Sequence, residues 1–231
     1  AGPKLMRSDQ PDIIAGFGES ITRFGASVPL VEGELDQAQH DVRNDVLGVA
    51  AGGMLVRRSV WTTLGGFDPG LPSIDAGLDF SIRARLAGFR VALVPGAKVA
   101  SAGGPELFGR RSVSDRRRAR IARAAQLHRR LVYARGGTLL LHWLSLVPLA
   151  ILRALGQLLA KRPGAVGGEF RAAFGVAFGA SHVGIARRQL KRTRALGWGA
   201  IAPLRLPGHE VRERSAQARL LCVTGRCRIS R

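Results

Sequence analysis

Cysteine and histidine are scarce in this 231-residue chain. Cys222 and Cys227 are its only cysteines, and they lie five positions apart near the C-terminus with no second pair, as expected for two reduced thiols. The five histidines are scattered, without the spacing of a metal-binding motif. The sequence therefore predicts neither a disulfide scaffold nor a cysteine or histidine metal centre.

Several familiar signatures are missing as well. The sequence has no secretory signal at its start and no Gly-rich phosphate loop of the P-loop or dinucleotide type. It also has no Asp-x-Asp and no internal repeat. Since the chain begins with "AGPKL" rather than with a start or signal sequence, we expect Ala1 to be a fragment boundary.

The net charge of +20 is unevenly distributed. Residues 1–100 hold 10 Lys/Arg and 11 Asp/Glu, whereas residues 101–231 hold 26 Lys/Arg and 5 Asp/Glu. A nearly neutral domain is thus joined to a strongly basic segment. Such asymmetry indicates contact with an anionic surface, either nucleic acid or anionic lipid.

The first half of the chain alternates between strand-like and helix-like segments. Short strands separated by Gly16, Gly18 and Gly25 are expected over residues 12–31. An acidic loop with some helix is expected over residues 32–45.

A second group of elements follows. Residues 46–58 are apolar and rich in glycine, so their backbone can approach a ligand or another strand closely. Ser59 is suited to cap a short helix that Gly65 stops. Residues 77–87 have helical periodicity, and Gly88 is placed to end that helix.

Two strands are expected next, residues 89–95, which Pro95 ends, and residues 97–101. Strands mixed with helices in this way predict an α/β domain with a mostly parallel sheet over residues 1–105.

The second half of the chain is basic and helical. Residues 106–135 are predicted to form a basic linker helix with Ser114 as its N-cap. Apolar and amphipathic membrane-associated helices are expected over residues 136–200, and a loosely ordered basic tail over residues 201–231.

The most apolar run, residues 138–160, is long enough to span a bilayer, since about 20 residues are needed. Binding within the membrane interface is equally favoured, because the run has an Arg-rich flank and contains Trp143. Four of its residues weaken the spanning alternative: His142, Pro148, Arg153 and Gln157.

Residues 46–95 carry a resemblance to a known family. They contain "AGGMLVRRSVWTTLGGFDPGLP" followed by "DAGLDFSIRARLAGFRVALVP". These motifs resemble the acceptor-side, C-terminal half of family 2 glycosyltransferases, which have the GT-A (nucleotide-diphospho-sugar transferase) fold. The leading "GPKL" and the acidic "GELDQAQHD" look like large actinobacterial membrane-associated members, and a weaker similarity extends to about residue 207.

The resemblance implies a catalytic base, which takes the proton of the acceptor hydroxyl as its oxygen attacks the anomeric carbon. The family places an acidic pair where this chain has Ala76 and Gly77, which cannot act as acids or bases. Asp75 and Asp79 flank the gap and are the two candidate catalytic residues. We favour Asp75 because it lies in a loop. Asp79 could instead cap its helix or pair with Arg83 at i, i+4.

Other candidate site residues come from the same motifs. Asp68, before a proline, is expected to bond its own backbone. Gly52, Gly53 and Met54 are predicted to line the cleft floor beneath the sugar, or else to be ordinary residues of a packed strand. Either Arg83 or Arg85 could face the donor phosphate, although we favour solvated charges on the helix surface.

The resemblance also implies partners and a location. The donor is a nucleotide-diphosphate sugar, and the acceptor is a cell-envelope glycan or a lipid-linked molecule at an anionic membrane surface. Mg²⁺ or Mn²⁺ is implied by the family alone, with its ligands outside this chain. We expect the donor-binding half upstream of Ala1, and a cell-membrane location with the catalytic domain on the cytoplasmic side.

Two other functions compete with an inverting transferase. Nine arginines between Arg110 and Arg130 suggest nucleic-acid binding. That segment has no interleaved aromatics and no docking motif, so we expect no nucleic-acid partner. A catalytically inactive membrane-anchored scaffold is the second alternative, because the acidic pair and the donor half are missing.

Overall fold

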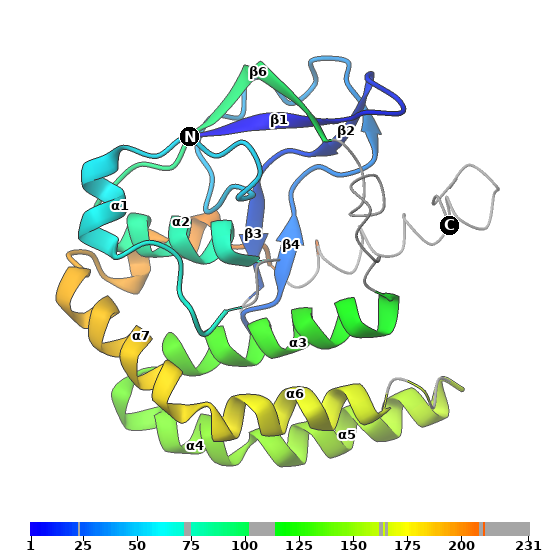
Figure 1. Cartoon of the computed structure of the whole chain (residues 1–231), viewed down its shortest axis with the longest axis vertical. Helices are drawn as coiled ribbons and strands as arrows, with labels where there is room; N and C mark the ends of the chain where they lie inside the picture. Colours follow the sequence, from blue (N-terminus) through cyan, green and yellow to red (C-terminus); the bar gives the residue numbers. More distant parts are fainter. Residues whose placement is uncertain are drawn as a thin grey trace.

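The computed structural model of the chain describes residues 1–22, 24–71, 75–101, 114–161, 164, 166–207 and 210. Strands form the upper part of the molecule in Figure 1, and helices form successive layers below them. The helices α1 (Arg58–Leu64) and α2 (Ala76–Leu86) lie between the sheet and the long helix α3 (Asp115–Val132).

The larger sheet has the strand order β5-β2-β1-β6. Only β1 and β6 are parallel; the β1–β2 and β2–β5 pairs are antiparallel, so the expectation of a mostly parallel sheet was wrong. The reason is the short turn between β1 and β2, since a parallel pair requires a long crossover. The strands are β1 (Gly2–Arg7), β2 (Ile13–Gly16), β5 (Glu34–Leu35) and β6 (Leu93–Ser101).

In place of the two strands predicted over residues 89–95 and 97–101, the structure has one strand, β6, which begins only at Leu93 and continues through Pro95. The β1–β6 register shifts at this proline. A bulge tolerates a residue without a backbone N–H, which explains why Pro95 does not end the strand.

A second, two-stranded sheet pairs β3 (Glu19–Ile21) with β4 (Ser27–Pro29). Short strands punctuated by glycine are thus confirmed over residues 12–31. The helix expected within residues 32–45 does not form, because β5 and turns occupy that segment. Glu19 and Gly48 exchange two backbone hydrogen bonds, which fix β3 to the Gly-rich segment.

The two inner helices confirm the glycine stop signals. Gly65 adopts a left-handed conformation with φ 69° at the end of α1, and Gly88 does so after α2 with φ 90°. Ser59, however, lies inside α1, and Arg57 at the N-cap makes no side-chain cap hydrogen bond. The cap prediction was therefore wrong.

Helices account for most of the second half. Ser114 caps α3 by accepting a hydrogen bond from the Arg117 amide, as predicted. The outermost layer in Figure 1 pairs α5 with α6, and α7 packs beside α2 and α3. The remaining elements are η3 (Gly136–Thr138), α4 (Leu139–Leu144), α5 (Leu146–Leu159), α6 (Val166–Phe178), α7 (Ala180–Thr193), η5 (Trp198–Ala200) and η6 (Ala202–Leu204).

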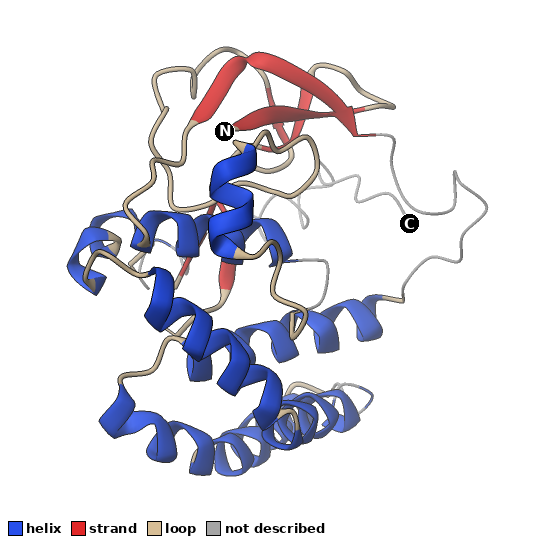
Figure 2. Cartoon of the chain, turned by 60° about the vertical axis from the view of Figure 1, so that its left-hand side comes forward, coloured by secondary structure: helices blue, strands red, loops and turns tan. Residues whose placement is uncertain are grey.

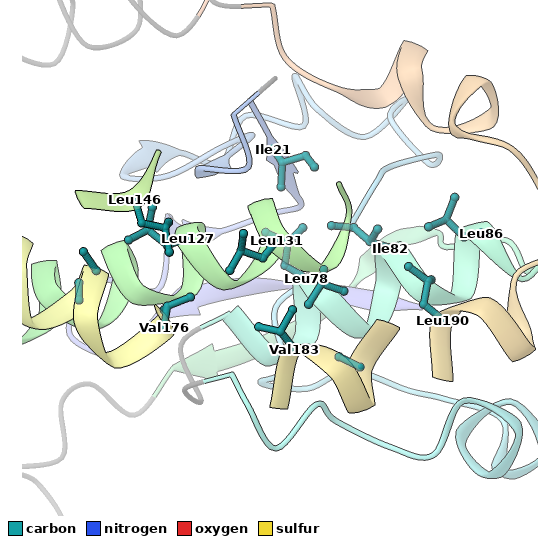
Figure 3. Close-up of a cluster of buried hydrophobic side chains, with 14 of the residues drawn as sticks. Ile21, Leu78, Ile82, Leu86, Leu127, Leu131, Leu146, Val176, Val183 and Leu190 are labelled. Carbon is teal, nitrogen blue, oxygen red and sulfur yellow. The ribbon is translucent and has the colours of Figure 1, made fainter. Parts of the chain in front are cut away.

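One hydrophobic core lies between α2, α3, α6 and α7 (Figure 3). The predicted apolar face of α2, which carries Leu78, Ile82 and Leu86, is fully buried in it. Leu131 from α3 and Val183 from α7 meet this face from the other side. A second core lies beneath the larger sheet and includes Ile14, Phe17, Leu64 and Phe80.

The apolar run over residues 138–160 is interrupted at Ser145. Pro148 has no N–H to donate to the carbonyl of Leu144, so the helix breaks one turn before it. Among the described residues no single helix has the length and apolar character for a membrane span. Gly136–Leu144 and Leu146–Leu159, bent by 44°, pass that test only as a pair.

Candidate functional site

A cleft of about 270 Å³ opens between the two sheets and the Gly-rich segment. Three carboxylates line it: Asp75 at the start of α2, Glu19 on β3 and Glu32 in the loop after β4. Backbone of the Gly-rich segment forms one wall through Ala50 and Gly52. The cleft therefore joins the favoured sequence candidate, Asp75, to residues far from it in the chain.

Asp75 is almost completely buried, and its carboxylate is held by two neighbours. Arg129 Nη1 donates to Asp75 Oδ2 at 2.7 Å, and Ser27 Oγ lies 3.4 Å from the same oxygen. The other carboxylate oxygen, Oδ1, has no hydrogen bond to another described side chain. Asp75 thus combines a fixed position with an oxygen open to a further partner.

Arg129 connects α3 to this cleft. Its side chain is 0 % exposed, and its Nε donates to the carbonyl of Gly25 at 3.0 Å. Gly25 has φ 78°, a conformation that glycine adopts without strain, and it packs against α3. An arginine of the predicted linker helix is consequently part of the site.

Glu19 was missed by the sequence reasoning. Its Oε2 is buried and has no hydrogen-bond partner among the described residues. Burial, together with the nearby charge of Asp75, raises the pKa of Glu19 to about 7, although Arg129 opposes the shift. The available signal was its position, since Glu19 is the only acidic residue between positions 13 and 31.

Asp79 occupies a different, closed environment. Arg83 Nε donates to Asp79 Oδ2 at 2.8 Å, which confirms the predicted i, i+4 pair, and the Tyr133 hydroxyl donates to Oδ1. Burial raises the pKa of Tyr133 well above its usual value, and the negative charge of Asp79 adds to the effect. Both oxygens of Asp79 are occupied, so this carboxylate has a structural environment.

The two arginines of α2 are not solvated, contrary to the favoured expectation. Arg83 is 4 % exposed and also donates to the carbonyls of Leu64 and Gly66, which fixes the end of α1. Arg85 donates to the carbonyls of Val46 and Val91. A guanidinium group can bind several carbonyl groups at once because it presents several donors in a fixed plane.

Gly77 stands where the family has an acidic residue, and it has no room for a side chain. A Cβ at this position would lie 2.4 Å from the backbone nitrogen of Ala51 and 2.6 Å from the carbonyl of Val49. The first turn of α2 therefore packs directly on the Gly-rich segment. Asp75, just before the helix, provides a carboxylate where Gly77 cannot.

Asp68 bonds its own backbone, as predicted, through the amide of Gly70 at 2.8 Å. Its second oxygen lies 2.9 Å from His128 Nε2 on α3. Burial opposes ionisation, but the hydrogen bonds from His128 and Gly70 outweigh it and hold the pKa of Asp68 below its usual value. Asp68 therefore ties the turn after α1 to α3, and it does not line the cleft.

The three predicted floor residues separate in the structure. Gly52 lines the cleft with Asp75. Gly53, with φ 74°, packs against Pro3 instead. Met54 lines an apolar hollow between α1 and α2.

The implied divalent metal has no ligand set here. No group of three Asp, Glu, His or Cys side chains in the described part of the chain lies close enough to hold a metal ion.

Residues 25–134 match the model of the glycosyltransferase-like family 2. The match spans 110 of the 231 residues and supports a domain in this region that is similar to family 2 glycosyltransferases. No curated protein and no solved structure matches the chain. The family match includes the transferase motifs, Asp75 and the whole of α3, whereas Glu19 precedes it.

Proposed function

We propose that this chain is the acceptor-side half of a GT-A glycosyltransferase that inverts the anomeric centre. The acceptor is a cell-envelope glycan or a lipid-linked molecule, and the donor is a nucleotide-diphosphate sugar. One observation supports this most: Asp75 of the transferase region and Glu19 face the same cleft. A transferase needs such a carboxylate beside the attacking hydroxyl.

The two carboxylates suit different tasks. Asp75 is committed to an ion pair with Arg129, whereas Glu19 has an unpartnered oxygen and a pKa of about 7. A base works best when its pKa lies near the working pH. Glu19 therefore accepts the proton as the hydroxyl oxygen bonds to the anomeric carbon and the bond to the departing diphosphate breaks. Asp75 binds the hydroxyl through Oδ1.

Association with the cytoplasmic face of the cell membrane belongs to the same proposal. The helices α4 and α5 expose large apolar side chains to solvent, which is unusual for a surface of this extent. They are Leu140, Leu141, Trp143, Leu144, Val147, Ile151, Leu152, Leu155, Leu158 and Leu159.

The test is sugar transfer by the protein as its host produces it, with a panel of nucleotide-diphosphate sugars and a host lipid extract as acceptor. Glu19→Gln and Asp75→Asn should each lower the transfer rate by roughly 10²- to 10⁴-fold, the usual contribution of acid–base catalysis. Asp12→Asn, an exposed carboxylate away from the cleft, serves as the control. Unchanged transfer by both cleft variants would refute the assignment.

A membrane-anchored scaffold is the second candidate, and the packing of Gly77 favours it. The family's acidic residue is excluded there by contact with backbone rather than merely replaced. A protein that binds a nucleotide sugar without transferring or hydrolysing it would support this alternative.

A further inference from the structure

A second and larger hollow lies on the opposite side of Ser27. It has a volume of about 790 Å³ and lies between the first turns of α3, the end of α5 and the start of α6. We call it the arginine groove, after the six arginines that line it: Arg116, Arg117, Arg120, Arg123, Arg153 and Arg171.

The charge of the arginine groove is not balanced from within. Among the described residues one acidic side chain lines it: Glu169, which accepts from Arg123 at 3.0 Å and lies 3.3 Å from Arg153. The other four arginines have no carboxylate partner among the described residues. Guanidinium groups that share a concave surface repel one another, so an anion bound between them is stabilised.

Two details show how closely the groove brings these groups together. The pKa of Arg123 is lowered by burial and by the charge of Arg153 nearby. The Arg116 guanidinium lies so close to Gly164 that a Cβ there would meet it at 2.8 Å. The N-terminal turns of α3 thus present arginines to a common space, whereas Arg129, about three turns later, is buried and forms an ion pair with Asp75.

The helix α5 connects the groove to the apolar surface. Arg153 and Gln157 line the groove, while Leu152 and Leu155 are 63 % and 52 % exposed on the same helix. A ligand with an anionic head and a hydrocarbon tail matches both features: the head is bound by arginine, and the tail covers exposed leucine.

The groove also adjoins the cleft. Ser27 lines both hollows and donates to Asp75. A molecule bound in the groove is therefore next to the carboxylates that are assigned to the transfer step.

We propose that the arginine groove binds a phosphate carried by a lipid, with the hydrocarbon chain against α5. This inference rests on the proposed membrane association and adds the site and the chemistry of recognition. Planar guanidinium groups bind phosphate oxygens two at a time, and a phosphate group with net negative charge suits the groove better than a zwitterionic headgroup, whose ammonium offsets the phosphate charge.

The experiment compares two triple variants of the full chain that lose the same charge. Arg116→Gln, Arg120→Gln and Arg171→Gln remove three of the six arginines of the groove, whereas Arg118→Gln, Arg188→Gln and Arg192→Gln alter exposed arginines outside it. Binding is measured by sedimentation with vesicles of phosphatidylcholine alone or with phosphatidylglycerol added. Thermal melting of each variant verifies that it is folded.

The expected result is preference for the anionic vesicles, with binding lowered roughly 10- to 100-fold in the groove variant and about threefold or less in the control, given about 1 kcal/mol per basic residue near a charged surface. Equal binding of both vesicles by all proteins would overturn the groove assignment while leaving apolar membrane association intact. Equal losses in the two variants would overturn it too, since charge alone would explain them.

A separate arm distinguishes a soluble source of phosphate. Inorganic pyrophosphate is titrated into the wild-type chain without vesicles and followed by calorimetry. Binding of pyrophosphate that the groove variant loses, combined with no binding to either vesicle, would overturn the lipid assignment and point to the donor diphosphate. Because sugar transfer is not measured, failure here is distinct from failure of the proposed reaction.

Discussion

Two regions of this protein use the same residue types for opposite purposes. The inner region around α2 buries its charges in pairs, such as Asp75 with Arg129 and Asp79 with Arg83. In the outer region, formed by α5, α6 and the first turns of α3, four arginines have no carboxylate partner among the described residues, and leucines are exposed. Figure 2 shows these two regions from the side, with the outer helices separated from the sheet by α3. The inner region is thus arranged by its own packing, whereas the outer surface is suited to an external partner.

Among the substitutions that test this comparison, replacement of a buried arginine should lower the free energy of unfolding most. Arg129→Ala leaves Asp75 buried without its ion pair, and we expect the free energy of unfolding to fall by roughly 3–5 kcal/mol. Arg118→Ala, an exposed position on the same helix, should change it by less than about 0.5 kcal/mol. Urea denaturation of both variants is the measurement, and similar losses would remove the distinction between the regions.

Glycine-to-alanine substitutions should change the free energy of unfolding in opposite directions in the two regions. Gly77→Ala forces a Cβ against the backbone of the Gly-rich segment and should cost about 1–3 kcal/mol. Gly175→Ala in α6 meets no atom within 4 Å and should stabilise the protein by about 0.5–1 kcal/mol, because alanine favours helix. Thermal or urea unfolding tests this pair, and a stabilising Gly77→Ala would contradict the tight packing.

The raised pKa of Glu19 predicts a pH-dependent stability. Because this carboxyl group holds its proton up to about pH 7 when folded and to about pH 4.5 when unfolded, stability falls as the pH rises between these values. Glu19→Gln removes that loss and should raise the free energy of unfolding by about 1–2 kcal/mol at pH 8, with little change at pH 4. Equal effects at both pH values would show that Glu19 does not titrate in this range.

The smallest effect is expected in the arginine groove. Arg120→Gln should change the free energy of unfolding by less than about 0.5 kcal/mol, since Arg120 has no carboxylate partner in the part of the chain that the structure describes. Unfolding in low and high salt is the measurement. A loss above about 1 kcal/mol would mean that the groove stabilises the fold rather than serving a ligand.

The sequence predicted the features that depend on residues close together in the chain. Gly65 and Gly88 end their helices, Ser114 caps α3, and the i, i+4 pair of Asp79 with Arg83 forms as expected. These features depend on residues within about one helical turn, so one segment contains all the information. The transferase motifs and the uneven charge could be recognised in the same way.

Only the tertiary structure decided which charges meet. Glu19, Asp75 and Arg129 come from three distant segments, and their convergence depends on how β3, α2 and α3 pack. The burial of Arg83 could not be inferred either, because its carbonyl partners, Leu64 and Gly66, lie at the end of α1 rather than on its own helix. Periodicity specifies the face of a helix on which a side chain lies, but the element that covers that face is set by the path of the whole chain.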